Sequence, residues 1–217
     1  MSKDIREFSS KVSGEKLTRD MEKYLNLALE LGATDARKIG VDEIILDERV
    51  RARCYSPRCP DYGTNLNCPP HFDWDLEKTR ELINNYKYAI FIMLKVPPEE
   101  QTGREYTNPK HPVPGARKMY EIVAKVQSAA FYDGHHLALG FAGGPSCKRV
   151  FCSAAECRGI KGEGCRMALK SNPSMHGAFM DAYSMASEMG WKVYPIGKTT
   201  ESSQIPHALE LGLVIIR

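Results

Sequence analysis

All seven cysteines of the chain fall in two short segments, and this clustering constrains the fold more than any other feature of the sequence. The first segment holds three of them and the second holds four, at Cys54, Cys59 and Cys68 and at Cys147, Cys152, Cys157 and Cys165. Cysteines that only pack in a hydrophobic core would be scattered over helices and strands. An odd number of thiols also cannot pair completely within one chain. The clustering therefore predicts metal binding by two loops rather than core packing or a set of disulfides.

The rest of the composition is that of an ordinary globular protein, with 42% hydrophobic and 26% charged residues. The first residues are charged and lack the apolar segment of a secretory signal. The longest apolar runs, 89–94 and 213–216, are far shorter than the roughly 20 residues that span a bilayer. We therefore expect a cytoplasmic protein without a membrane span, where clustered thiols bind metals or carry redox chemistry. The net charge of +3 is too small to indicate a nucleic-acid partner.

The hydrophobic pattern predicts helices that alternate with short strands. Apolar residues recur at helical spacing in four segments, 17–31, 75–86, 115–132 and 174–189. Apolar runs rich in β-branched and aromatic residues predict four strands, at 88–96, 136–141, 191–196 and 211–216. Segment 41–50 fits either a short helix or a strand, and the proline-rich segment 97–114 predicts a loop.

This alternation predicts an α/β fold, in which a layered core of helices on a small mixed sheet carries two cysteine-rich metal-binding loops. The loops are expected at residues 53–71 and 143–166, where glycine, proline, asparagine and aspartate are frequent. We expect a single domain over residues 17–217, preceded by an N-terminal extension of residues 1–16.

The cysteine spacing bears on the kind of metal. Thiolates are soft ligands that suit zinc or an iron–sulfur cluster. Zinc sites usually combine two close cysteine pairs with a long spacer between them. The second segment instead spaces single thiols over residues 147–165, which favours one loop wrapped around a [4Fe–4S] cluster, although the spacing is not that of bacterial ferredoxins. Zinc is the alternative metal.

The first segment supplies only three thiols, so a metal bound there needs a further ligand. His71, Asp61, a thiol of another chain or a small molecule are the candidates for the fourth position. The other histidines have no spacing that supports a metal site. In particular, the adjacent His135 and His136 would point to opposite faces of a strand.

Basic residues surround the second segment. Six cations and two anions lie between residues 148 and 170, namely Lys148, Arg149, Arg158, Lys161, Arg166 and Lys170 against Glu156 and Glu163. Cations stabilise the negative charge of a thiolate-bound cluster, and nearby glycines let backbone amides approach sulfur. We favour this charge-compensating role. The alternative is a solvated basic surface, or one that docks an acidic partner such as a redox protein.

Several stretches resemble a family of predicted metal-binding proteins catalogued as domain of unknown function 2284. The resemblance rests on residues 47–54 (DERVRARC), Cys59-Pro-Asp-Tyr-Gly, Cys68-Pro-Pro, Gly144-Pro145, Cys165-Arg166 and Asn172-Pro173-Ser174-Met175. It extends over nearly the whole chain from about Leu17. The resemblance implies a cytoplasmic protein of an anaerobic bacterium or archaeon that holds an iron–sulfur cluster and acts beside redox enzymes.

Together these features predict an iron–sulfur protein with one or two [4Fe–4S]-type clusters and all seven cysteines as metal ligands. It would serve electron transfer or cluster delivery to a partner redox protein or oxidoreductase complex in an anaerobe. Motifs of dinucleotide-binding, hydrolase and zinc-protease enzymes are absent, which favours an electron-transfer or accessory protein over a stand-alone enzyme. The alternatives are a zinc-stabilised interaction module and a redox enzyme with an open metal site at the three-cysteine segment. Self-association is compatible with the sequence.

Overall fold

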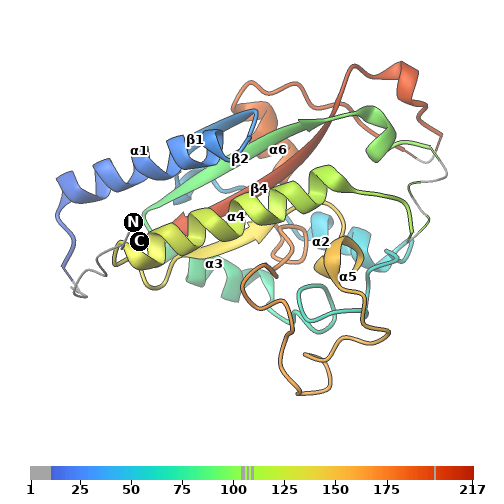
Figure 1. The fold of residues 1–217 in the computed structure, drawn as a ribbon, viewed down its shortest axis with the longest axis horizontal. Coiled ribbons are helices and arrows are strands. Elements are labelled where there is room, and N and C mark those ends of the chain that lie inside the picture. Colours follow the sequence, from blue (N-terminus) through green and yellow to red (C-terminus); the bar gives the residue numbers. More distant parts are fainter. Residues whose placement is uncertain (1–10, 104–105, 107, 109, 198) are drawn as a thin grey trace.

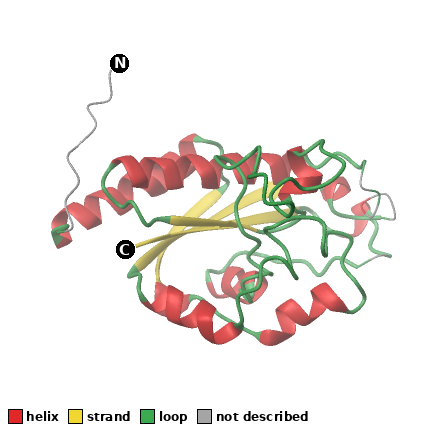
Figure 2. Ribbon diagram, turned by 90° about the horizontal axis from the view of Figure 1, so that it is seen from below, coloured by secondary structure: helices red, strands yellow, loops and turns green. Residues whose placement is uncertain are grey.

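The computed structural model describes residues 11–103, 106, 108, 110–197 and 199–217. A four-stranded sheet lies between two layers of helices (Figures 1 and 2). Its strands are β1 (Asp35–Gly40), β2 (Tyr88–Val96), β3 (Leu139–Ala142) and β4 (Ala208–Ile216), in the order β1-β2-β4-β3. The expected α/β fold with helices layered on a small sheet is confirmed.

Helices cover both faces of the sheet (Figure 2). One face is covered by α1 (Gly14–Glu30) and α4 (Pro114–Tyr132), the other by α3 (Leu76–Asn84) and α6 (Ala182–Glu188). Two short helices carry cysteines, α2 (Glu48–Tyr55) and α5 (Cys147–Phe151). Single 3₁₀ turns are η1 (Val41–Glu43), η2 (Pro98–Glu100) and η4 (Ser202–Gln204). Residues 1–10 of the expected N-terminal extension, 1–16, lie outside the described residues. Helix α1 begins at Gly14, within the last three residues of that extension.

All three strand pairings are antiparallel, so the expectation of a mixed sheet was wrong in that detail. The reason lies in the position of the C-terminal strand. Helix α4 connects β2 to β3, which run in the same direction, as in a parallel crossover. Strand β4 lies between them and runs against both, with Phe91 and Phe141 on either side of Leu213. The sequence predicts the C-terminal strand at 211–216 but not its position between the two ends of the crossover.

The two central strands alternate their side chains between the two helical layers. On β4, Val214 and Ile216 pack with α1 and α4, whereas Leu213 and Ile215 belong to the cluster with α3 and α6. Strand β2 follows the same period of two. All four of these β4 side chains are fully buried, because each face of the sheet is covered. This explains why both central strands appear in the sequence as nearly continuous apolar runs.

Two glycines allow α4 to pack closely on the sheet. A Cβ on Gly212 would lie 2.6 Å from Cγ2 of Val123 and 2.7 Å from Sδ of Met119. A Cβ on Gly140, on the neighbouring strand, would lie 2.5 Å from Cγ1 of the same valine. Both glycines therefore lie where the helix packs closely on the backbone of the sheet.

The helix expected at 174–189 is much shorter than its apolar spacing suggested. Only Ala182–Glu188 is helical, and Asp181 caps it by accepting a hydrogen bond from the Ser184 backbone N–H at 3.1 Å. The preceding residues form turns, and Phe179 adopts a positive φ of 62° that a helix does not permit. Met175 and Met180 are buried in these turns, so the core, and not a helical face, explains their spacing.

Other elements differ from expectation at weakly patterned segments. Residues 191–196 form no strand, and the strand expected at 136–141 begins only at Leu139. Segment 41–50 divides into η1 and the start of α2. Strand β1, with the polar sequence DARKIG, was not predicted because it is an edge strand with few apolar residues. The remaining predicted helices and strands are confirmed to within a few residues.

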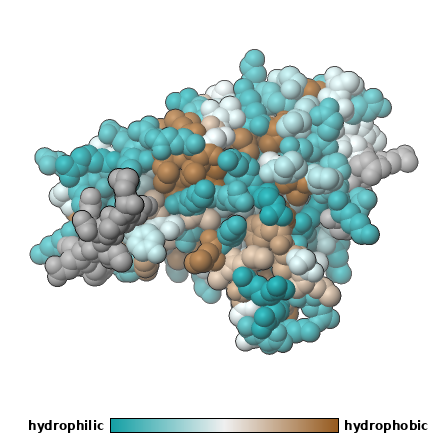
Figure 3. All heavy atoms as spheres, viewed as in Figure 1, coloured by the Kyte–Doolittle hydropathy of each residue, from teal (hydrophilic) through white to brown (hydrophobic). Residues whose placement is uncertain are grey.

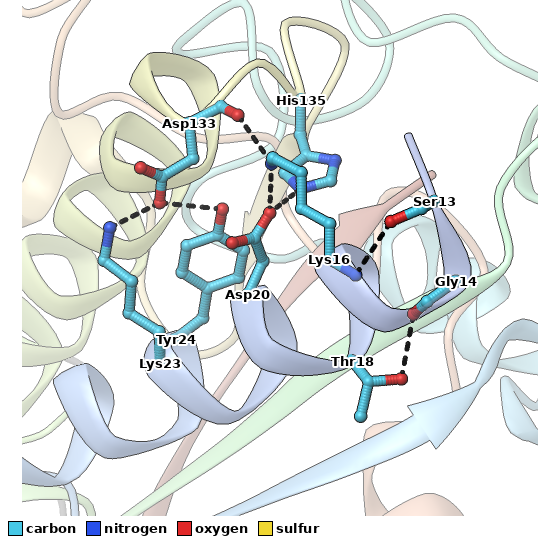
Figure 4. Close-up of polar contacts among 9 residues, drawn as sticks. All are labelled: Ser13, Gly14, Lys16, Thr18, Asp20, Lys23, Tyr24, Asp133 and His135. Atoms are coloured by element: carbon cyan, nitrogen blue, oxygen red, sulfur yellow. Dashed lines mark hydrogen bonds and ion pairs between the residues drawn. The ribbon is translucent and has the colours of Figure 1, made fainter. Parts of the chain in front are cut away.

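A polar network fixes α1 to the turn after α4 (Figure 4). His135 Nε2 lies 2.9 Å from Asp20 Oδ2, and Lys16 forms an ion pair with the same carboxylate. Lys16 also donates to the backbone carbonyl of Asp133 at 2.9 Å, and the Tyr24 hydroxyl donates to its side chain at 3.1 Å. His135 is in a turn rather than on a strand, so the expectation that the adjacent histidines would face opposite sides of a strand was wrong.

We expect Asp20→Asn to lower the free energy of unfolding at neutral pH by about 2 kcal/mol. The buried carboxylate of Asp20 has hydrogen bonds with Lys16 and His135, and the uncharged amide of asparagine would weaken both. Burial acts to raise the pKa of Asp20, but Lys16 and His135 outweigh it and lower the pKa below 3.8. The carboxylate therefore stabilises the fold above that pH, and the effect is lost as the pH falls through the folded pKa. Urea unfolding of both proteins in an acid series would measure it, with Glu77→Gln of an exposed ion pair as the control. An equal loss in the control would contradict the prediction.

Candidate metal centre

The first cysteine segment begins on a helix and continues through consecutive turns. Cys54 lies in the last turn of α2, and its carbonyl accepts a hydrogen bond from the Cys59 backbone N–H at 3.1 Å. The Cys68 carbonyl accepts from Phe72 N–H at 3.0 Å. Helix α2 is held by the buried Arg51, which donates to the carbonyl of Phe72 at 2.9 Å. One arginine therefore fixes Cys54 relative to the chain that follows Cys68.

These three cysteines line one cavity of about 370 Å³, with Cys54, Cys59 and Cys68 along one part of its wall. Burial raises the pKa of each of the three thiols, most strongly that of Cys68, which is only 9% exposed. In the absence of a cation the three groups are therefore thiols at neutral pH. Metal binding at this cavity would have to displace protons from sulfur.

The second segment places its four cysteines around another cavity, of about 250 Å³. Cys147 begins α5 and Cys152 follows its end, whereas Cys157 and Cys165 lie in turns. Exposure rises along the segment, from the buried Cys147 to the exposed Cys165. The sequence divides the cysteines into a set of three and a set of four, and in the structure each set lines its own cavity. Cys54 and Cys147 lie on short helices and not in irregular loops, because each helix ends or begins at the cavity wall.

Backbone amides surround the Cys157 sulfur. Burial acts to raise the pKa of this thiol, but the N–H groups of Ile160, Leu66 and Gly159 and the charge of Lys148 outweigh it and hold the pKa below 9.0. A Cβ on Gly159 would lie 2.4 Å from Cδ1 of Leu66, so glycine lets the backbone pack against that side chain beside the sulfur. The Met167 N–H also donates to Cys165 Sγ at 3.4 Å. The amides around Cys157 favour negative charge on its sulfur.

The first segment also contributes to the cavity of the second. Asn65, Leu66 and Asn67 line the four-thiol cavity, and Asn67 Nδ2 donates to Cys147 Sγ at 3.4 Å. In the other direction, the Ser146 hydroxyl and backbone N–H donate to the Asp61 carboxylate at 2.8 and 3.1 Å. The two cavities are therefore neighbours that share one supporting segment.

The thiols line these cavities without meeting at one point. In the part of the chain that the structure describes, no three His, Cys, Asp or Glu side chains are grouped as ligands of a single metal ion. Each cavity is many times larger than the roughly 30 Å³ that one water molecule occupies.

Of the two side chains expected as a fourth ligand of the three-thiol cavity, Asp61 lies at the cavity and His71 does not. Asp61 lines the cavity, although its carboxylate already accepts two hydrogen bonds from Ser146. His71 is exposed and is not part of the cavity wall. His176 does line the cavity, and sequence reasoning missed it because the residue follows Cys68 by more than a hundred positions. Burial lowers the pKa of His176, and Arg53 lowers it further, which favours the neutral imidazole that can bind a metal.

The basic residues have several separate roles. Lys148 lines the four-thiol cavity and donates to the carbonyls of Ala154 and Ala155. Arg149 points the other way, to the three-thiol cavity, where its guanidinium lies over the Tyr106 ring at 4.7 Å. The two acidic residues of the segment are both paired, Glu163 with Arg158 and Glu156 with Lys161.

An α/β core that carries two thiol-lined cavities has the ligand set of a protein that binds soft metals. A family model described as predicted metal-binding protein (DUF2284) matches residues 37–210, and the chain belongs to this family. The matched range includes all seven cysteines. No curated protein and no solved structure matches the chain. None of the helices in the described ranges is long and apolar enough to span a bilayer.

Proposed function

We propose that the protein is an iron–sulfur redox protein with two metal centres. The four-thiol cavity would hold one [4Fe–4S] cluster on Cys147, Cys152, Cys157 and Cys165. The three-thiol cavity would hold a second centre, on Cys54, Cys59 and Cys68, with one position that cysteine does not fill. The observation that carries this proposal is the separation of the seven thiols into two neighbouring cavities.

The dimensions of the four-thiol cavity suit a cluster better than a single ion. A cluster is several atoms wide and needs sulfur ligands spread around its outside. The thiols here line a cavity of about 250 Å³. Hydrogen bonds from Asn67 to Cys147 and from Met167 to Cys165 reach two of the sulfurs. Such bonds are among the features that set the reduction potential of a cluster.

Asn65 lies between the two proposed centres. Its side chain contacts the Cys147 sulfur, with Oδ1 at 3.9 Å, and also hydrogen-bonds to Cys68, so one buried residue touches a thiol of each cavity. Two centres bound at these thiols would lie on either side of Asn65, which supports electron transfer between them. When bound, the metal centres would supply the electron-transfer chemistry, while the protein holds them, shields them and sets their surroundings.

The four-thiol cavity is the one that faces a partner. Residues 152–170 form a lobe that projects from the body of the molecule (Figure 1), and its visible surface is largely hydrophilic (Figure 3). Cys165 is exposed on this lobe and Leu169 is 92% exposed. Both acidic residues of the lobe are paired, which leaves a basic excess around the cavity. A basic rim with an exposed apolar residue fits an acidic redox protein as the electron partner.

Anaerobic purification tests the proposal directly. The protein is expected to be brown, to contain iron and acid-labile sulfide in similar amounts, and to lose part of its visible absorption on chemical reduction. Metal analysis and an absorption spectrum of the same sample would measure this. A sample stripped with a chelator and reconstituted with iron and sulfide provides the control. Colourless protein with stoichiometric zinc would contradict the proposal and would favour a zinc-stabilised interaction module.

A further inference from the structure

The turns at residues 174–180 bring His176 to the first cysteine segment. The Ser174 backbone N–H donates to the carbonyl of Asn67 at 3.1 Å, and Asn67 directly precedes Cys68 in the chain. His176 follows Ser174 by only two residues. One backbone hydrogen bond therefore links the turn that carries the histidine to the segment that carries the most buried of the three thiols.

The same turns are attached to helix α2, which carries Cys54. The Phe179 carbonyl accepts a hydrogen bond at 2.9 Å from the backbone N–H of Asp47, the residue that caps α2. The guanidinium of Arg51, on α2, lies over the Phe179 ring at 4.8 Å. The Phe179 N–H in turn donates to the His176 carbonyl at 3.1 Å. His176 is therefore fixed relative to α2 as well.

The imidazole of His176 is available to a ligand. The residue lines the three-thiol cavity and is half-buried. Neither ring nitrogen forms a hydrogen bond within the described residues, and neither is among the fully buried atoms that lack a partner. Both nitrogens therefore keep accessible surface. His135 and His207 differ in this respect, because each has one ring nitrogen that is buried without a partner.

The carboxylates on the cavity wall are already engaged. Both oxygens of Asp61 accept hydrogen bonds from Ser146, and both oxygens of Asp181 accept from Ser184 at the start of α6. A metal bound by either aspartate would have to compete with these contacts. Of the imidazole and carboxylate groups on the wall, only His176 has no hydrogen-bond partner within the described residues.

The charges at the cavity also favour a neutral fourth ligand. Cys68 is buried, Cys54 and Cys59 are half-buried, and metal binding converts the three thiols into thiolates. Asp61 and Asp181 already add two carboxylates to the wall. A further anion in this confined cavity would be costly, whereas an imidazole adds no charge. Imidazole nitrogen can also replace cysteine sulfur as a ligand of iron–sulfur clusters.

We propose that His176 is the fourth protein ligand of the centre at Cys54, Cys59 and Cys68, and that it binds through a ring nitrogen. The inference rests on the proposed function and deepens it, because it assigns the position that cysteine leaves open. Three thiolates and one imidazole make a centre less negative by one charge than four thiolates do. Such a ligand set raises the reduction potential of the centre.

Pulsed paramagnetic resonance of chemically reduced, iron-loaded protein tests the inference, with histidine labelled by a heavy nitrogen isotope as the probe. An imidazole bound to iron is expected to give a strong coupling between the labelled nitrogen and the unpaired electron. His176→Gln should abolish this coupling. His71→Gln is the matched control and should leave it unchanged, because His71 is exposed and lies outside the cavity wall. Coupling that survives in a folded His176→Gln, or that is lost in His71→Gln, would overturn the inference.

His176→Cys separates ligation from a structural role and serves also if His176→Gln does not fold. A cysteine there is expected to keep the iron, to abolish the histidine coupling, and to shift the midpoint potential of one centre to a more negative value. The other centre should keep its potential, and His71→Cys should change neither. Redox titration followed by visible absorption would measure this. Loss of the iron of that centre, or unchanged potentials of both centres, would overturn the assignment.

Iron analysis of each sample separates this inference from the proposed function. Protein that takes up no iron would contradict both. Iron-loaded wild-type protein without a histidine coupling would contradict the assignment of His176 alone, and the fourth position would then belong to a small molecule or to a group from another chain.

Discussion

At neutral pH the Glu210→Gln variant is expected to be more stable than the wild-type protein, by about 3 kcal/mol. The carboxyl of Glu210 is buried, and burial raises its pKa from 4.5 to about 8. In the unfolded chain the same group ionises freely above 4.5. At pH 7 unfolding is therefore favoured by about 1.4 kcal/mol for each pH unit above 4.5. Glutamine has nearly the same shape and can still pair with Gln101, but it gains nothing from ionisation on unfolding.

The pH dependence identifies this cause. Between about pH 4.5 and pH 8 the folded protein binds more protons at Glu210 than the unfolded chain, so wild-type stability falls as the pH rises. Above about pH 8 the folded carboxyl also ionises, and the difference between the two proteins becomes constant. Urea unfolding at several pH values, with both proteins in the same metal state, would measure it. Glu22→Gln on the exposed side of α1 is the matched control. A constant difference across this range would refute the explanation.

The sequence predicted the regular core well because periodicity reports burial. Strand β2 was placed at its exact bounds, since a strand buried on both faces is a continuous apolar run. Helices α1 and α4 were found from their apolar spacing and the glycines that follow them. The edge strand β1 carries a polar sequence, so no local pattern distinguishes it from a loop. Residues 174–181 show the opposite error, because buried turns can mimic helical spacing.

The candidate site was predictable in its ligands but not in its surroundings. Clustered thiols are visible in any sequence, and their division into three and four corresponds to two cavities. His176, Glu210 and the carbonyl contact of Arg149 depend on the fold. They come from a buried turn, the start of β4 and the segment after β2, which only tertiary packing brings together. Nothing in the local sequence marks Glu210, because a single acidic residue in an apolar strand usually faces solvent.

Replacement of one cysteine from each set is expected to remove different parts of the bound iron. Cys165→Ser should abolish the cluster of the four-thiol cavity and leave the other centre in place, because Cys165 lines the four-thiol cavity and not the three-thiol cavity. Cys68→Ser should do the reverse. Each variant would then retain part of the iron, and the spectra of the two losses should add up to that of the wild-type protein. Iron analysis and absorption spectroscopy of anaerobic samples would measure this.

Matched variants keep the experiment decisive. Ser153→Ala lies in the same segment as the four thiols and should retain all of the iron, which separates ligand loss from general disturbance of the loop. Cys68 is buried, so its serine variant carries a risk to folding that the more accessible Cys59→Ser avoids at the same cavity. If either Cys59→Ser or Cys165→Ser lost all of the iron while the fold remained intact, the seven thiols would serve one common centre. The contacts of Asn65 with both Cys68 and Cys147 would then mark the middle of that centre rather than the boundary between two.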